Sequence, residues 1–205
     1  MLLATDLDGT FLAGDPEDRL SLYQTIAAHP EIRLAYVTGR SLEAVLPLLD
    51  DPTLPRPDYI IADVGASLYD GQTLQPIQPL QGQIDLRWPG ESQVAQALAG
   101  FADLERQDVP QARRCSYFCT PQRAADPALL QAAEALNCDL LYSAERYLDF
   151  LPRGVNKGSS LQALADWLEL EHDQVLAAGD TLNDLSMLSS TFKGVCVGAS
   201  EVGLL

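Results

Sequence analysis

Short apolar runs alternate with helical patterns along the first part of the chain. Residues 2–7 form an apolar run that ends in a polar turn, and 32–38 and 59–64 repeat this pattern. Between these runs, the sequence predicts helices over 17–28 and 41–49. Strands separated by helices predict a parallel sheet with right-handed crossovers, which is the doubly wound, Rossmann-like α/β class.

The middle of the chain departs from this alternation. Residues 67–79 predict a hairpin that turns near Asp70. The elements expected next are a helix, a strand, a second helix and two strands, over 93–105, 115–119, 127–137, 140–142 and 148–151 in that order. We interpret residues 82–153 as a small inserted α+β domain, within a core formed by 1–81 and 154–205.

The first pattern returns after the insertion. A helix is predicted over 159–168 and strands over 175–178 and 194–197, with a turn and a helix between the two strands. The chain stops at Leu205, where another helix would start. We therefore expect the core to lack its C-terminal end.

The acidic composition narrows the function classes. Of the 205 residues, 29 are acidic and 13 are basic, which gives a net charge of −16. Nucleic acids and anionic membrane surfaces both attract Lys and Arg, so neither is expected as a partner. No apolar run approaches the roughly 18 residues of a membrane span. Four scattered cysteines favour a cytoplasmic protein with reduced thiols, for which a monomer is the default expectation.

Asp6 and Asp8 follow the first predicted strand. Because they lie two positions apart on an extended segment, their side chains leave the same face. Ligands bind at the carboxyl ends of parallel strands, which is where this pair is placed. Neighbouring carboxylates repel unless a proton or a cation separates them, and Mg²⁺ favours such oxygen ligands. We expect Mg²⁺ here, with an ordinary acidic loop as the alternative.

Asp180 and Asp184 form a second acidic cluster directly after another apolar strand. An Asp-rich turn is often only a helix cap. This one is predicted at the same sheet edge as Asp6 and Asp8, where several carboxylates would be destabilising without a metal. We therefore expect Asp180 and Asp184 to join the metal site.

Two further segments suggest anion binding. Thr38, Gly39 and Arg40 end the second predicted strand and offer a hydroxyl, a backbone N–H and a cation. Lys157 opens a predicted helix, whose N-terminal amides favour anions. The alternative for Arg40 is a helical ion pair with Glu43, three residues later.

Together these residues are suited to phosphoryl transfer. One aspartate can attack phosphorus to form an aspartyl-phosphate, and the other can protonate the leaving alcohol and later deprotonate water. Without shielding by Mg²⁺ and Lys157, two unit charges about 4 Å apart repel by roughly 4 kcal/mol at an effective dielectric near 20. That repulsion would slow the reaction about a thousandfold.

The order of these motifs resembles the haloacid dehalogenase (HAD) superfamily over nearly the whole chain. The residues that carry the resemblance are Asp6-Leu7-Asp8-Gly9-Thr10, Thr38-Gly39-Arg40, Lys157, Gly179-Asp180 and Asn183-Asp184. The insertion resembles the C2B type of HAD cap. Segments 36–41, 57–61, 64–66 and 149–158 are most similar to sucrose-phosphate phosphatases and the related mannosylfructose-phosphate phosphatases.

The resemblance implies a role for each of these residues. Asp6 would be the nucleophile and Asp8 the general acid and base. The metal ligands would be Asp6, Asp180, Asp184 and, through its main-chain carbonyl, Asp8. The phosphoryl group would be held by Thr38, Gly39, Lys157 and Asn183, with Asn183 orienting Lys157 or the phosphate. Superfamily dehalogenases lack the second aspartate because halide needs no proton, so Asp8 favours phosphoryl chemistry.

The cap would recognise whatever carries the phosphate, and its candidate contacts are Arg113, Arg114, Ser116, Tyr117, Glu145 and Arg146. Arg40 and Ser41 of the core are further candidate substrate contacts. The resemblance thus implies a Mg²⁺-dependent phosphatase acting on a sugar phosphate or a phosphorylated disaccharide. One alternative is a phosphohexomutase of the phosphomannomutase type, which shares the motifs and the cap. Another is a catalytically silent HAD-like domain that partners a glycosyltransferase. A signalling receiver domain is disfavoured, because its acidic pair is adjacent and no cap interrupts its fold.

Overall fold

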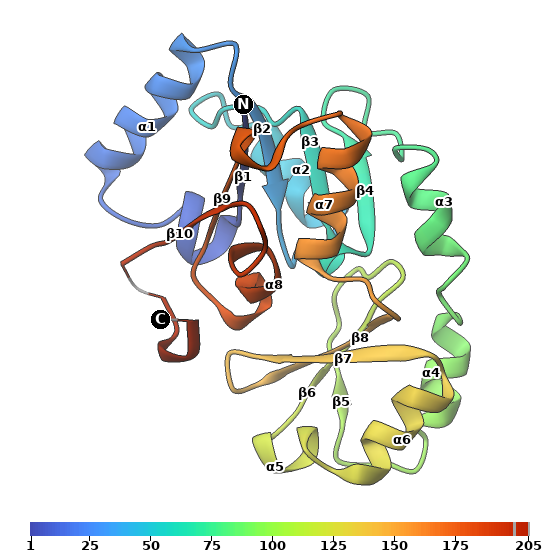
Figure 1. Cartoon of the computed structure of the whole chain (residues 1–205). Helices are drawn as coiled ribbons and strands as arrows, with labels where there is room; N and C mark the ends of the chain where they lie inside the picture. Colours follow the sequence, from blue (N-terminus) through green and yellow to red (C-terminus); the bar gives the residue numbers. More distant parts are fainter. Residues whose placement is uncertain (199, 205) are drawn as a thin grey trace.

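A six-stranded sheet forms the larger part of the molecule (Figure 1). The computed structural model describes residues 1–198 and 200–204, so the expected chain end at Leu205 lies outside the described residues. In spatial order the strands are β10 (Lys193–Cys196), β9 (Val175–Gly179), β1 (Leu2–Thr5), β2 (Arg33–Val37), β3 (Tyr59–Ala62) and β4 (Ser67–Asp70). All pairs are parallel except β3 with β4. The predicted α/β class is confirmed.

Alternate residues of the strands feed a separate core on each face of this sheet. Ala35 and Val37 of β2 lie in the cluster under α7 (Lys157–Trp167), whereas Leu34 and Tyr36 lie in the opposite cluster. This alternation follows from the two-residue period of a strand. The opposite face carries α1 (Pro16–Ala28) and α2 (Leu42–Leu49), which lies behind the sheet in Figure 1.

A second, four-stranded sheet lies beyond the carboxyl ends of the parallel strands (Figure 1). We call it the cap sheet. It is antiparallel, in the order β5 (Glu105–Arg106), β6 (Cys115–Phe118), β8 (Tyr147–Pro152) and β7 (Cys138–Ser143). Its own apolar cluster contains Val94 of α4 (Glu91–Ala97) and Leu129 of α6 (Pro127–Ala135). The short helix α5 (Pro121–Ala124) lies beside the cap sheet. The predicted domain boundaries stay a prediction.

Two predicted elements differ from the structure. The helix expected over 93–105 ends at Ala97, before Gly100, and Glu105 already belongs to β5. Glycine is about 1 kcal/mol less favourable than alanine inside a helix. The hairpin expected over 67–79 is reduced to β4 and a single bridge between Tyr69 and Pro76, since proline has no N–H to continue a ladder.

Two helices were absent from the predictions, the single-turn α5 and a longer helix ahead of it in the chain. The longer helix, α3 (Leu80–Asp85), places Leu80 and Ile84 in the cluster under α7. Their i, i+4 spacing is the helical signal that a hairpin interpretation of the preceding residues obscured. The short elements that follow β9 include a helical turn over Leu182–Asp184 and α8 (Leu185–Leu188).

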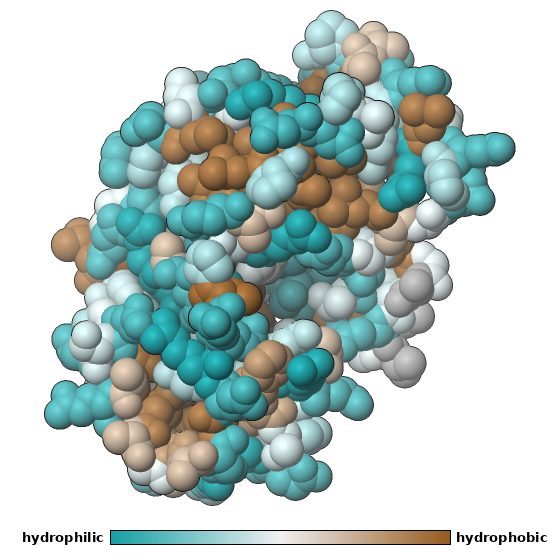
Figure 2. Space-filling view, turned by 180° about the vertical axis from the view of Figure 1, so that it is seen from behind, coloured by the Kyte–Doolittle hydropathy of each residue, from teal (hydrophilic) through white to brown (hydrophobic). Residues whose placement is uncertain are grey.

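Hydrophobic side chains gather on the rear of the larger part of the molecule (Figure 2). On that side α2 leaves Leu46 exposed and Leu42, Leu48 and Leu49 partly buried. Within the described residues, no helix has both the length and the apolar character needed to cross a membrane.

Candidate active site

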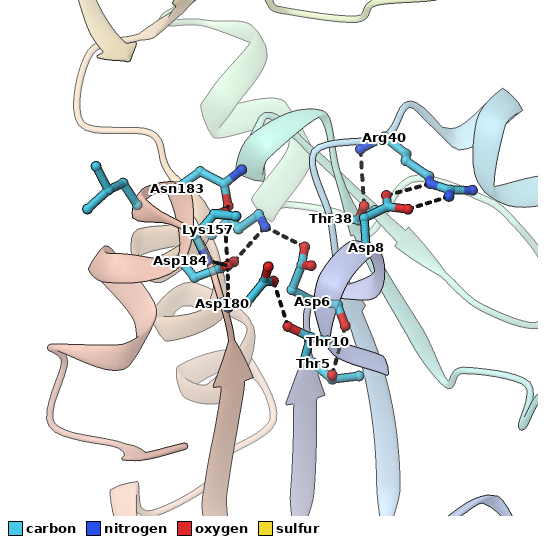
Figure 3. A network of polar contacts seen from close by, with 12 residues as sticks. Thr5, Asp6, Asp8, Thr10, Thr38, Arg40, Lys157, Asp180, Asn183 and Asp184 are labelled. Atoms are coloured by element: carbon cyan, nitrogen blue, oxygen red, sulfur yellow. Dashed lines mark hydrogen bonds and ion pairs between the residues drawn. The ribbon is translucent and has the colours of Figure 1, made fainter. Parts of the chain in front are cut away.

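Three aspartates and a lysine meet at the carboxyl edge of the large sheet (Figure 3). Asp6 follows β1, Asp180 follows the neighbouring strand β9, and Asp184 ends the helical turn after it. One carboxylate oxygen from each aspartate lies within 4.8 Å of the others, and all three residues are buried. We call Asp6, Asp180, Asp184 and Lys157 the core cluster.

Lys157 is the centre of the core cluster. Its side chain is 0% exposed, and its Nζ donates to Oδ1 of Asp6 and Oδ1 of Asp184, each at 2.6 Å. It is the first residue of α7, whose N-terminus is capped by Asn156 through a reciprocal pair of hydrogen bonds with Ser159. The cap fixes where the helix starts and hence where the lysine points.

Burial controls the charges of this cluster. It raises the pKa of Asp6 to about 6, the neighbouring aspartates add to the rise, and Lys157 opposes it. Burial also raises the pKa of Asp180, against the hydrogen bond from Thr10. For Lys157, burial works against the charged form, but its two carboxylate partners outweigh it and the pKa is raised.

The core cluster fits a hard divalent cation. Three carboxylates and one ammonium leave two negative charges uncompensated in a buried site, which is costly unless a cation neutralises them. The available donors are carboxylate oxygens, which Mg²⁺ prefers.

The turn after Asp6 is packed against Asp180. Gly9 has φ +84°, and a Cβ there would lie 2.1 Å from Oδ2 of Asp180, so any other residue would be strained and would displace the Asp180 carboxylate. The next residue, Thr10, donates from Oγ1 to Oδ1 of Asp180 at 2.8 Å. These contacts join the first and last motifs of the chain.

Asp8 lies outside the core cluster. Its side chain is 59% exposed and accepts two hydrogen bonds from Arg40, from Nε at 2.7 Å and from Nη2 at 2.5 Å. The alternative pairing of Arg40 with Glu43 is therefore wrong, because the guanidinium turns toward the first motif. A metal contact from the main-chain carbonyl of Asp8 stays a prediction.

The predicted phosphate ligands lie around the same edge. Thr38 is buried, and its Oγ1 accepts from the backbone N–H of Arg40 at 3.1 Å. Gly39 and Asn183 line the cleft described below. The Oδ1 atom of Asn183 accepts from Thr181 at 2.9 Å, and no hydrogen bond joins Asn183 to Lys157 in the part of the chain that the structure describes.

A cleft of about 350 Å³ separates the core edge from the cap sheet. Asp6 and Arg40 line it from the core, and Gln107, Arg114 and Tyr147 line it from the cap side. The two candidate serines differ in position. Ser41 lines the cleft, although its Oγ also caps α2 by accepting from the N–H of Ala44 at 3.4 Å.

Ser116 is not placed in the lining of the cleft. It is 0% exposed, and its hydroxyl donates to Asp149 of the same sheet. The β6–β8 pairing sets Ser116 opposite Asp149 on the same face of the cap sheet, so the carboxylate of Asp149 accepts its hydroxyl. A direct contact of Ser116 with substrate is therefore not supported by this position.

Sequence reasoning missed a second buried ionic group, which we call the cap-side cluster. Arg114 lies 3.5 Å from Asp63 through Nη2 and 3.5 Å from Asp149 through Nη1. Burial raises the pKa of Asp63 to about 6 against the pull of Arg114, and it also raises the pKa of Asp149. Asp63 directly follows the apolar strand β3, the same signal that identified Asp6 and Asp180. Asp149 lies inside β8 and does not follow the end of a strand, so the sequence gives no such signal for it.

The family model for sucrose-6F-phosphate phosphohydrolase matches residues 1–205. The chain belongs to this family. It is 31% identical to the mannosylfructose-phosphate phosphatase of Agrobacterium fabrum, over 96% of this chain and 82% of that protein. Its structure is similar to that of the sucrose-phosphatase from Synechocystis, solved with sucrose and phosphate, with a TM-score of 0.84, 28% identity and coverage of 100% of this chain and 85% of the other.

A third relative is much longer than this chain. The glucosylglycerol-phosphate synthase of Pseudomonas anguilliseptica is 80% identical over 100% of this chain, which spans 27% of that protein. The chain likewise spans 58% of a putative HAD-like hydrolase from Nitrosococcus oceani. Membership of the sucrose-phosphatase family confirms the resemblance to HAD phosphatases, which are phosphoric monoester hydrolases.

Proposed function

We propose that this chain is a Mg²⁺-dependent phosphatase that hydrolyses the phosphate ester of a glycoside through an aspartyl-phosphate on Asp6. The observation that carries the proposal is the core cluster. There a buried carboxylate at a strand end is held by a fully buried lysine and faces two more aspartates.

The chemistry follows from the residues around Asp6. An Asp6 oxygen attacks phosphorus as the bond from phosphorus to the sugar oxygen breaks, and Asp8 gives that oxygen its proton. Water then attacks phosphorus, Asp8 takes the proton, and Asp6 is released with inorganic phosphate. Asp6, Asp180, Asp184 and the Asp8 carbonyl would hold Mg²⁺, which supplies shielding between the anionic phosphate and the carboxylates. Lys157, Thr38, the Gly39 amide and Asn183 would hold the phosphoryl oxygens.

The names of the relatives support a glycoside as the group that carries the phosphate. One relative is a phosphatase of mannosylfructose phosphate, another a sucrose-phosphatase, and the 80% identical one a synthase of glucosylglycerol phosphate. Ser41 and Arg114 line the cleft and are the proposed contacts for the hydroxyl groups of the glycoside. Arg40 also lines the cleft, but its guanidinium is engaged by Asp8. A glycosyltransferase is the proposed partner. A cytoplasmic location is proposed because all four cysteines, which lie within the described residues, are unpaired.

The test is release of inorganic phosphate from sucrose 6-phosphate, mannosylfructose phosphate and glucosylglycerol phosphate, with Mg²⁺ and with EDTA. We expect release that requires both Mg²⁺ and Asp6, with the Asp6→Asn variant as the control. A product that retains phosphate at a new position would instead indicate a mutase. No turnover of any ester would indicate a catalytically silent domain.

A further inference from the structure

Asp8 and Arg40 form a two-point ion pair beside the core cluster, and both line the cleft (Figure 3). The two contacts, 2.5 and 2.7 Å, use both oxygens of the carboxylate. Parallel hydrogen bonds of this kind fix the direction of a carboxylate as well as its position.

Packing restrains Asp8 less than its neighbours, because its side chain is 59% exposed whereas Asp6, Asp180 and Asp184 are buried. Lys157 holds Asp6 and Asp184, and Thr10 holds Asp180. Among the described residues, Arg40 is the one hydrogen-bond partner of the Asp8 carboxylate. Without it, an exposed aspartate on a turn has several staggered side-chain rotamers open to it.

Arg40 is itself well anchored. Its backbone N–H donates to Oγ1 of Thr38 at 3.1 Å, and its carbonyl accepts from the N–H of Asp63 at 2.8 Å. The backbone of Arg40 is thus tied to the ends of β2 and β3. The two hydrogen bonds from the guanidinium then restrict where the Asp8 carboxylate can lie.

We propose that Arg40 is a positioning residue that orients Asp8 for proton transfer and so decides which leaving groups the site can expel. This inference rests on the proposed function, in which Asp8 protonates the leaving oxygen. For that step one Asp8 oxygen exchanges its contact with Arg40 for the proton, and the other oxygen stays held by the guanidinium. A sugar alkoxide needs that proton, whereas p-nitrophenolate leaves without it. Loss of Arg40 therefore lowers the rate for sugar esters and spares nitrophenyl esters.

The experiment measures kcat/KM for a glycoside phosphate and for p-nitrophenyl phosphate. This parameter covers only the steps up to departure of the alcohol, so the shared second step does not enter. For Arg40→Ala we expect a fall of about 100-fold on the glycoside phosphate, the low end of a general acid's contribution, and less than about 3-fold on the nitrophenyl ester. Asp8→Asn should give the same pattern, and the double variant no further loss.

Two further variants distinguish the orienting role of Arg40 from its positive charge and from a general effect on folding. Arg40→Lys keeps the charge without the planar fork, so its loss on the glycoside phosphate should be intermediate. Arg123→Ala is the matched control, because Arg123 is 29% exposed against 31% for Arg40 and also pairs with aspartates, in the cap. It should leave both substrates unaffected.

Equal losses of kcat/KM on both esters in Arg40→Ala would overturn the inference, since Arg40 would then bind phosphate. Unchanged values on both would also overturn it, because the pair would then be only a surface contact. A wild-type chain inactive on both esters would instead refute the proposed function itself, and this inference with it.

Discussion

The two buried ionic clusters of the molecule have similar compositions and different construction. In the core cluster Lys157 contacts Asp6 and Asp184 at 2.6 Å, and Asp180 lies beside them at the same edge of one sheet. The cap-side cluster joins Arg114 and Asp149 of the inserted segment to Asp63 of the core, at 3.5 Å. The first has the charge excess and geometry of a metal site. The second joins the side of the cap sheet to the end of β3 in the larger sheet.

The largest difference between the clusters is expected from Asp6→Asn. Phosphate release should fall by at least about a thousandfold, because the nucleophile is removed. The melting temperature should change little, since an amide of the same shape also relieves repulsion among the carboxylates. Release assays and thermal unfolding of the same preparation check both expectations. Retained turnover would remove Asp6 from the mechanism.

Arg114→Met should act mainly on stability. It would leave Asp63 and Asp149 buried without their counter-ion, and breaking a buried pair costs about 3–5 kcal/mol. Urea unfolding measures the loss. Arg113→Met is the matched control, because Arg113 is the adjacent residue and pairs with Asp85 at a more exposed position. Equal losses of unfolding free energy in the two variants would show that the burial of Arg114 does not increase the contribution of its ion pairs.

Asp63→Asn should change the pH dependence of stability. The folded pKa of Asp63 is about 6 against an ordinary 3.8, so the fold favours its protonated form. That contribution is present at low pH and is lost as pH rises through about 6. The loss amounts to about 3 kcal/mol.

The comparison of wild type with Asp63→Asn in EDTA isolates this residue, because Asp6 titrates in both proteins. Between pH 3 and 7.5 the wild type should lose about 3 kcal/mol more unfolding free energy than the variant. Equal losses of unfolding free energy in the two proteins would mean that burial does not disfavour the ionised form of Asp63.

The smallest expected effect is stabilisation by Mg²⁺, which should depend on the core cluster and not on the cap-side cluster. Saturating Mg²⁺ should stabilise the wild type by about 2.7 kcal/mol at a hundred times the dissociation constant. Asp180→Asn should abolish the resulting rise in melting temperature, whereas Asp63→Asn should keep it. A rise that persists in Asp180→Asn but vanishes in Asp63→Asn would place the ion in the cap-side cluster.

The same contrast explains what the sequence could predict. Asp6 and Asp180 each follow an apolar strand, so the topology of a parallel sheet alone brings them to one edge. Lys157 was identified because it opens a helix. The Asp8–Arg40 pair was not predicted, since local spacing offered Glu43 and the true partner lies 32 positions away.

The cap was less predictable for a related reason. The contacts of Arg114 depend on how the inserted segment lies against the core, which no local pattern encodes. Ser116 has a polar side chain on a strand, but the strand pairing places it opposite Asp149, which accepts its hydrogen bond. The end of α4 was misplaced because apolar residues continue past Gly100.

The most direct test of the account is the mass of the intact protein after rapid quenching with p-nitrophenyl phosphate and Mg²⁺. Asp8→Asn should accumulate one phosphoryl group, because departure of nitrophenolate needs no acid whereas water attack needs a base. Asp6→Asn and the double variant should stay at their unmodified masses. A phosphoryl group on the double variant, or an unmodified Asp8→Asn that still releases phosphate, would contradict an aspartyl-phosphate on Asp6.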